Sequence, residues 1–356
     1  MSENKVLIGA VNVTSTEVKC PGCGGTIGIK FDPESLNLCC PFCGLSSRLP
    51  QPGTGPAVRE VDFNSAYQRA SVNWGKVKKL IVCANCGGQT LYDAEQITGA
   101  CPFCGSTSVN PAAENPQIMA PQGIIPFSVS KDMTQNIFTA YMKRKHCLAK
   151  GVVDSKLENV TGIYLPYWTF DALTVSSFKA YYYVMKVKNY YTGIWNQFFD
   201  DSIISASDRF RHPVIKKVQH FDFSGVVPYS PEYLAGIPAE RYTVGLNEGW
   251  ERAKTQMTEK IKRDIYRKKG LNFFFEEFNT NYYNVRFRYF LAPIYIASYR
   301  YKKKKLLVTI NGQTGEIFCD APTFIPKLVT LCLIIFFILL GLFLYKVVFP
   351  KIGLVF

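Results

Sequence analysis

The spacing of apolar residues predicts two amphipathic helices in the second part of the chain. Residues 131–149 have apolar side chains near helical spacing and a basic C-terminal half, which complements the helix dipole. Residues 247–269 show the same spacing, and Gly270 follows as a stop signal. Each segment therefore has one apolar face to bury.

Apolar and aromatic runs around these helices predict strands. They cover 164–172 with the tyrosine-rich run that follows, then 283–301 and 306–310. Asn311-Gly312 lies between two apolar runs and predicts a hairpin turn, because both residues tolerate positive φ. The expected body is α+β, with a mainly antiparallel sheet and two helices.

The longest apolar run is Leu328–Tyr345, which holds eighteen residues without a charge. It is apolar all round a helix, whereas a soluble helix keeps a polar face, although a buried core helix is the alternative. Its length predicts a C-terminal transmembrane helix over 326–348 that contacts membrane lipid. Lys302–Lys305 favour a cytosolic position for the preceding residues, so the expected location is the cell membrane, single-pass, with the bulk of the chain cytoplasmic.

Eight of the twelve cysteines form four Cys-x-x-Cys pairs, which group into two units with zinc-ribbon spacing. No secretory signal opens the chain, so a reducing compartment is expected, where paired cysteines bind metal rather than form disulfides. Four thiolates suit zinc better than a rubredoxin-like iron or a redox dithiol. Two zinc ions per chain are expected, held by Cys20, Cys23, Cys40 and Cys43 and by Cys83, Cys86, Cys101 and Cys104.

The two units look like an internal duplication. The string Cys-Pro-Phe-Cys-Gly recurs at 40–44 and 101–105, and this match selects Cys40 over its neighbour Cys39 as a ligand. The glycine after each pair suits a turn that needs positive φ. The expected segments are zinc ribbon 1 (1–47), a linker with a short helix at 59–73 (48–77), zinc ribbon 2 (78–110), an α+β domain (111–325), the transmembrane helix (326–348) and a short tail (349–356).

Charge and the polar residues bear on function. The net charge is +14, and residues 251–305 alone hold 15 Lys and Arg against 5 Asp and Glu, which favours an anionic partner. The three histidines are scattered, and the neighbours Asp200 and Asp201 would face opposite sides of a strand. Closed four-cysteine zinc sites are structural, so the chain is not expected to be an enzyme.

Four further segments follow the ribbons in a fixed order: GIIPF (123–127), GIYLPYWTFDA (162–172), VPYSPEYLAGIPAERY (227–242) and NGQTGEI (311–317). In this arrangement the chain resembles a bacterial family of double zinc-ribbon proteins with a ribbon of the transcription-factor-IIB type. The resemblance implies membrane-anchored relatives found with phage-shock-type and stomatin-like membrane-stress proteins, which would be the protein partners. Some relatives are labelled as the primosomal replication-restart helicase, but no G-x-x-x-x-G-K-[ST] phosphate loop is present here.

These observations predict a non-enzymatic, membrane-tethered adaptor whose ribbons recruit protein partners at the cytosolic membrane face, in a membrane-stress response. A membrane-associated nucleic-acid-binding protein is the alternative, because the charge is basic and ribbons are used in transcription proteins.

Overall fold

The computed structural model shows a fold that is mostly β over the residues it describes. The predicted α+β class is therefore wrong, because the body is a half-barrel sheet to which ribbon and linker residues add strands. The description covers residues 7–8, 11–12, 20–25, 28–50, 58–63, 78–85, 89–93, 101, 106–112, 119–145, 151–208, 217–270, 273–302, 304–322 and 335–342.

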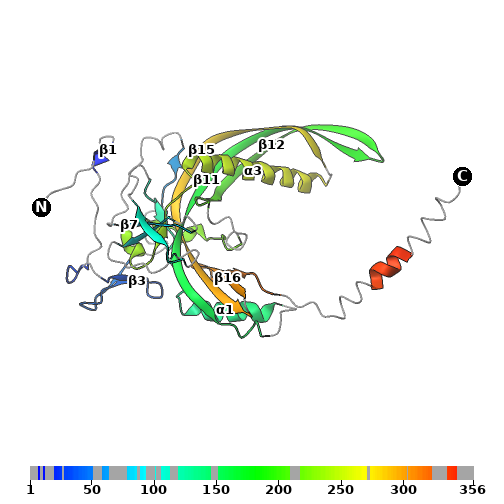
Figure 1. Ribbon diagram of the computed structural model, residues 1–356. Coiled ribbons are helices and arrows are strands. Elements are labelled where there is room, and N and C mark those ends of the chain that lie inside the picture. Colours follow the sequence, from blue (N-terminus) through cyan, green and yellow to red (C-terminus); the bar gives the residue numbers. More distant parts are fainter. Residues whose placement is uncertain are drawn as a thin grey trace.

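Three long strands form the half-barrel. Strand β11 (Leu157–Val184) lies between β12 (Val187–Ser205) and β15 (Phe274–Tyr301) and pairs antiparallel with both. Aromatic and β-branched residues, which favour the pleated backbone, are frequent in all three. The strands predicted at 164–172 and 283–301 are parts of these longer elements, which arch over the molecule (Figure 1).

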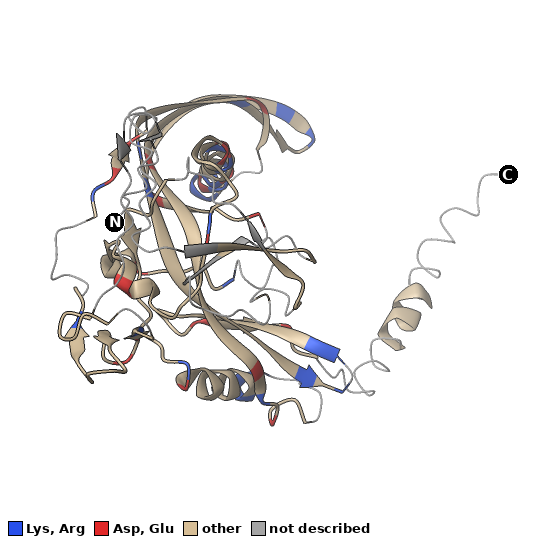
Figure 2. Ribbon diagram, turned by 60° about the vertical axis from the view of Figure 1, so that its left-hand side comes forward, with Lys and Arg blue, Asp and Glu red and all other residues tan. Residues whose placement is uncertain are grey.

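Helix α3 (Leu246–Lys269) lies in the hollow of this arch and is seen nearly along its axis in Figure 2. The helix ends where predicted, because Gly270 takes φ +63 and donates its N–H to the carbonyl of Tyr266. A stripe of small and apolar residues faces β11 and β12. The stripe recurs every fourth position and comprises Gly249, Ala253, Met257, Ile261 and Ile265.

Trp168 of β11 fills the space between the sheet and the start of α3. Its indole N–H donates to the Val244 carbonyl at 2.9 Å. The ring centroids of Tyr242 and Tyr289 lie 5.3 and 4.8 Å from its own. On the helix side, a Cβ added to Gly249 would lie only 2.9 Å from the Trp168 ring, so the helix approaches this ring through a glycine.

The other end of the sheet carries the second helix. Strands β16 (Lys304–Asn311) and β17 (Ile317–Cys319) extend the sheet beyond β15, and α1 (Met133–Arg144) contacts β17. The helix predicted within 131–149 and the strand predicted at 306–310 are therefore confirmed.

The turn predicted at Asn311-Gly312 forms in a different way. The side-chain oxygen of Asn311 accepts the N–H of Gln313 at 2.8 Å, which stabilises a longer loop. Gly315, not Gly312, takes the positive φ of +73. A Cβ at Gly312 would lie 2.5 Å from the ring of Phe127, so close packing requires glycine there.

The two ribbon regions differ in how their strands are organised. The first has a separate antiparallel sheet of β3 (Lys30–Asp32), β4 (Asn37–Cys39) and β5 (Ser46–Arg48). The second joins the main sheet through β7 (Lys78–Cys83), β8 (Gln89–Asp93) and β9 (Val109–Ala112). The second ribbon is thus an extension of the body.

Short strands complete the description. In place of the start of the helix predicted at 59–73, β6 (Val61–Asp62) pairs with β15, and residues 64–77 lie outside the described residues. The other short elements are β1 (Leu7–Ile8), β2 (Val11–Asn12), β10 (Gly123–Ile124), β13 (Val227–Pro228), β14 (Ala239–Glu240) and the 3₁₀ helices η2 (Phe223–Gly225) and η3 (Pro231–Leu234).

The prediction of a transmembrane helix over 326–348 is contradicted. Within the described part of the chain, no helix has both the length and the apolar character needed to cross a membrane. Residues 335–342 are helical, and the rest of the predicted span, 326–334 and 343–348, lies outside the described residues. The predicted single-pass, tail-anchored location is wrong on the same ground.

Candidate metal centre

Two turns with the same hydrogen bonds carry the cysteines of the first ribbon. In each turn the first cysteine donates its N–H to the carbonyl five residues on, at 2.9 and 3.0 Å. The glycine four residues on donates back to that cysteine at 2.9 and 3.1 Å. As predicted, these glycines, Gly24 and Gly44, take positive φ, at +71 and +70. The first turn carries Cys20 and Cys23, and the second carries Cys40 and Cys43.

The four sulfur atoms of these turns form one cluster. All lie within 4.8 Å of one another, with 3.5 Å between Cys20 and Cys43 and 3.7 Å between Cys23 and Cys40. Four thiolates at about 2.3 Å from a tetrahedral ion would be about 3.8 Å apart. The cluster could therefore hold a metal ion, and Cys39 lies outside it with its sulfur 3.9 Å from the Ser46 hydroxyl.

Backbone N–H groups polarise the cluster. The N–H groups of Cys23 and Gly22, helped by neighbouring thiols, lower the pKa of Cys20 to about 6. The N–H of Leu45 lowers the pKa of Cys43, but the hydrogen bond with Cys20 and burial outweigh it and raise that pKa to about 12. The Cys20 thiolate is thus favoured and the Cys43 thiolate is not, so binding of a cation by all four sulfurs would displace the proton of Cys43.

Two of the four predicted ligands of the second ribbon are described. Cys83 ends β7 and is buried, as is Cys101. The N–H of Cys101 donates to the Ser106 carbonyl at 2.7 Å, which repeats the five-residue hydrogen bond of the first ribbon. Cys86 and Cys104 lie outside the described residues.

The first ribbon is fixed to the body by residues 231–242, which we call the docking segment. The Phe31 N–H donates to the Ala235 carbonyl at 3.1 Å, and the Phe31 ring lies 5.4 Å from the ring of Tyr233. The hydroxyl of Tyr233 in turn donates to the carbonyl of Pro50. Hydrogen bonds and an aromatic contact therefore hold the ribbon in one position.

The same docking segment holds the second ribbon. Its strand β14 pairs with β8 on one side, where Ala239 lies opposite Leu91. On the other side Ala239 lies opposite Tyr164 of β11. The docking segment thus connects both ribbons to the central strand of the arch, a role that sequence patterns did not indicate.

Two apolar side chains of the first ribbon are exposed. Phe42 and Leu45, on the second cysteine turn, are 66% and 38% exposed. Phe31 and Leu38, on the opposite strands, are buried. The metal cluster therefore lies between a docked side and an exposed apolar side.

A second group of polar side chains lies where β6, β11 and β12 meet. The carboxylates of Glu60, Asp171 and Asp200 lie within 4.8 Å of one another. Arg288 pairs with Asp201 and lies 3.5 Å from Glu60. Burial, and then the hydrogen bond with Glu60, raise the pKa of Asp171 to about 7.

The prediction that Asp200 and Asp201 diverge is wrong. A register shift in the β11–β12 pairing lies at this point, and Asp201 takes φ +48. The Asp201 N–H donates to the Asp171 carboxylate at 2.8 Å. Burial first, and then the carboxylates of Asp171 and Asp201, raise the pKa of Asp200. A β-bulge thus brings together carboxylates that a regular strand would separate.

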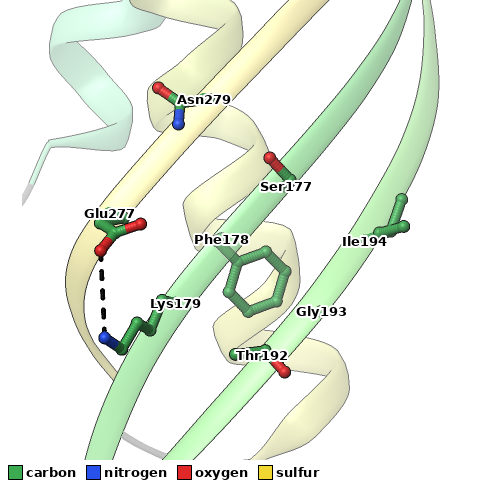
Figure 3. Close-up of a pocket in the computed structure, with 8 residues that line it drawn as sticks. All are labelled: Ser177, Phe178, Lys179, Thr192, Gly193, Ile194, Glu277 and Asn279. Atoms are coloured by element: carbon green, nitrogen blue, oxygen red, sulfur yellow. Dashed lines mark ion pairs between the residues drawn. The ribbon is translucent and has the colours of Figure 1, made fainter.

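Among the residues that the structure describes, the remaining polar side chains form no comparable site. His220 is exposed and lies 2.9 Å from the Glu316 carboxylate, while His146 and His212 lie outside the described residues. A shallow hollow of about 470 Å³ opens on the outer face of the arch, where Lys179 and Glu277 form an ion pair at 3.9 Å (Figure 3).

Comparison with known proteins yields one similar chain. No family model and no solved structure matches. The chain is 26% identical over 324 residues to the uncharacterized protein YdjG of Bacillus subtilis (strain 168), a similarity that covers 85% of this chain and 89% of that protein. The two proteins are therefore similar over most of their lengths.

Proposed function

We propose that this chain is a non-enzymatic adaptor whose first ribbon binds a protein partner through its exposed apolar turn. The observation that carries the proposal is the position of Phe42 and Leu45, which are exposed beside a four-cysteine cluster on a ribbon that is hydrogen-bonded to the body. A metal held by four thiolates has no open coordination position, which suits a structural role and not catalysis. Exposed aromatic side chains of this kind are the usual anchors of protein interfaces.

Zinc is the metal we propose for the first cluster. Thiolate sets with tetrahedral spacing favour zinc or iron–sulfur centres, and the observed sulfur separations match the tetrahedral distances for zinc. We extend the proposal to a second zinc held by Cys83, Cys86, Cys101 and Cys104. Its support is the repeated sequence spacing and the repeated hydrogen bond at Cys101.

Site-specific photo-crosslinking from position 42 tests the adaptor proposal. A photoreactive phenylalanine at Phe42 in the full chain should capture one protein reproducibly in the native cells. The added change Leu45→Asp should abolish that capture while metal content stays the same. The matched control carries the photoreactive residue at Met185, which is 95% exposed in the turn between β11 and β12.

Two results would contradict the proposal. One is capture of the same protein from positions 42 and 185 alike. The other is binding of DNA or RNA that has a steep salt dependence and is lost in the Leu45→Asp variant. That result would favour the alternative, in which the ribbon binds nucleic acid.

A further inference from the structure

Strand β12 leaves a long edge of the sheet open. Within the described part of the chain, β12 pairs with β11 alone over its nineteen residues. An unpaired edge presents backbone N–H and C=O groups and can pair with another strand. Proteins usually protect such edges with central lysines, prolines or shortness.

The middle of β12 lacks these protections. Residues 189–199 (NYYTGIWNQFF) contain no proline and no charged residue. On the face away from α3, Tyr190, Ile194 and Phe198 are 59%, 73% and 60% exposed. Figure 3 shows Ile194 on this face, with α3 behind the strands. The edge is therefore long, uncharged and apolar on its open face.

We propose that β12 pairs antiparallel with β12 of a second copy of this chain, about a two-fold axis at Ile194. In this register a residue that lies a given number of positions before Ile194 faces, in the second copy, the residue that lies the same number of positions after Ile194. Lys188 then faces Asp200, Tyr190 faces Phe198, and Thr192 faces Asn196 of the second copy. Each contact is made twice, as a two-fold interface requires.

Charge selects this register from the neighbouring ones. A two-fold pairing that keeps the outer faces together can move its axis only by whole residues along β12. An axis at Gly193 would place Lys188 opposite Phe198, and an axis at Trp195 would place Asp200 opposite Tyr190. The axis at Ile194 pairs both charged ends of the segment with opposite charges.

The first test is the mass of the full chain in solution. We expect twice the chain mass of 40.2 kDa at micromolar concentration, measured by light scattering or sedimentation. Ile194→Lys places two like charges together at the axis and should weaken the dimer by at least about a hundredfold. A monomeric wild type, a larger open assembly, or an Ile194→Lys protein that stays dimeric would overturn the proposal.

A charge exchange tests the register. Lys188→Asp and Asp200→Lys should each weaken the dimer, because each places like charges opposite one another. The double variant should restore it, even though the contact of Lys188 with Glu276 is lost in the double variant too. Lys179→Asp is the matched control, since Lys179 lies on the same face but on the inner strand β11. Failure of the double variant to restore a dimer would refute this register.

Hydrogen exchange gives a reading that needs no variant. Amides of 189–199 should become more protected as the protein concentration rises through the dimer dissociation constant. Amides of β11 serve as the internal reference, because this strand is paired within one copy. Protection of 189–199 that is independent of concentration would contradict pairing between copies.

Discussion

The first ribbon and the arch of three long strands maintain their structures in opposite ways. Among its described residues the ribbon buries only three large apolar side chains, Ile29, Phe31 and Leu38. The arch buries many aromatic side chains, of which Trp168 is the largest. A unit with so small a core is expected to depend on a bound metal, whereas the arch draws its stability from buried area. We therefore expect the ribbon to be sensitive to chelators and the arch to be sensitive to changes in packing.

Metal removal should give the largest difference in stability between the first ribbon and the arch. Structural zinc contributes about 10–16 kcal/mol of apparent binding free energy, so a strong chelator should abolish exchange protection over residues 28–50. Protection over 157–205 should persist. The double variant Cys23→Ser/Cys43→Ser should behave like the chelated protein. A ribbon that keeps its exchange protection without metal would show that it does not depend on metal for its structure.

Truncation of the central tryptophan should have the reverse effect. Trp168→Ala removes a fully buried side chain and its hydrogen bond to Val244, so we expect a loss of about 3–5 kcal/mol in the free energy of unfolding. Chemical denaturation of the arch measures it, and metal content should stay unchanged. The control Met185→Ala, at a 95% exposed position, should change stability by less than about 0.5 kcal/mol.

A smaller effect is expected where α3 meets Trp168. Gly249→Ala places a Cβ 2.9 Å from the indole ring, and overpacking of this kind costs about 1–3 kcal/mol. The gain in helix propensity, about 1 kcal/mol, opposes this loss. Chemical denaturation of Gly249→Ala and wild type measures the balance of the two terms. A Gly249→Ala protein that is more stable than wild type by the full propensity gain would show that the contact between helix and ring is loose.

The last prediction concerns pH. The pKa of Asp171 is raised from about 3.9 to about 7 on folding, so the protonated carboxyl is favoured in the folded state. Its stabilising contribution is complete below the unfolded value and is lost as pH rises through about 7. Relative to wild type, Asp171→Asn should therefore gain stability as the pH rises from about 5 to 8. Denaturation curves that shift in parallel would contradict this assignment.

Local patterns predicted several elements correctly, because their causes lie within a few residues. The stop of α3 at Gly270 follows from a left-handed glycine, and the two cysteine turns follow from Gly24 and Gly44. The clustering of the first four cysteines was predictable for the same reason, since spacing alone brings two such turns together.

The failures depend on contacts that spacing does not contain. The bulge at Asp200–Asp201 depends on pairing with β11, and alternation in a regular strand predicts the opposite result. The apolar run at 328–345 has the composition of a membrane helix, yet no helix among the described residues is long and apolar enough to cross a membrane. The half-barrel was underestimated because β6 to β9 add strands from the linker and the second ribbon.

The docking segment also has a consequence for the order of events during synthesis. Residues 231–242 leave the ribosome long after the first ribbon, on the order of ten to forty seconds later at usual elongation rates. The segment from Cys20 to Cys43 is therefore fully synthesised, and could bind metal, before the docking segment that contacts the ribbon has been synthesised. On this timetable the proposed metal can bind first, so that the body would close on a ribbon that is already formed.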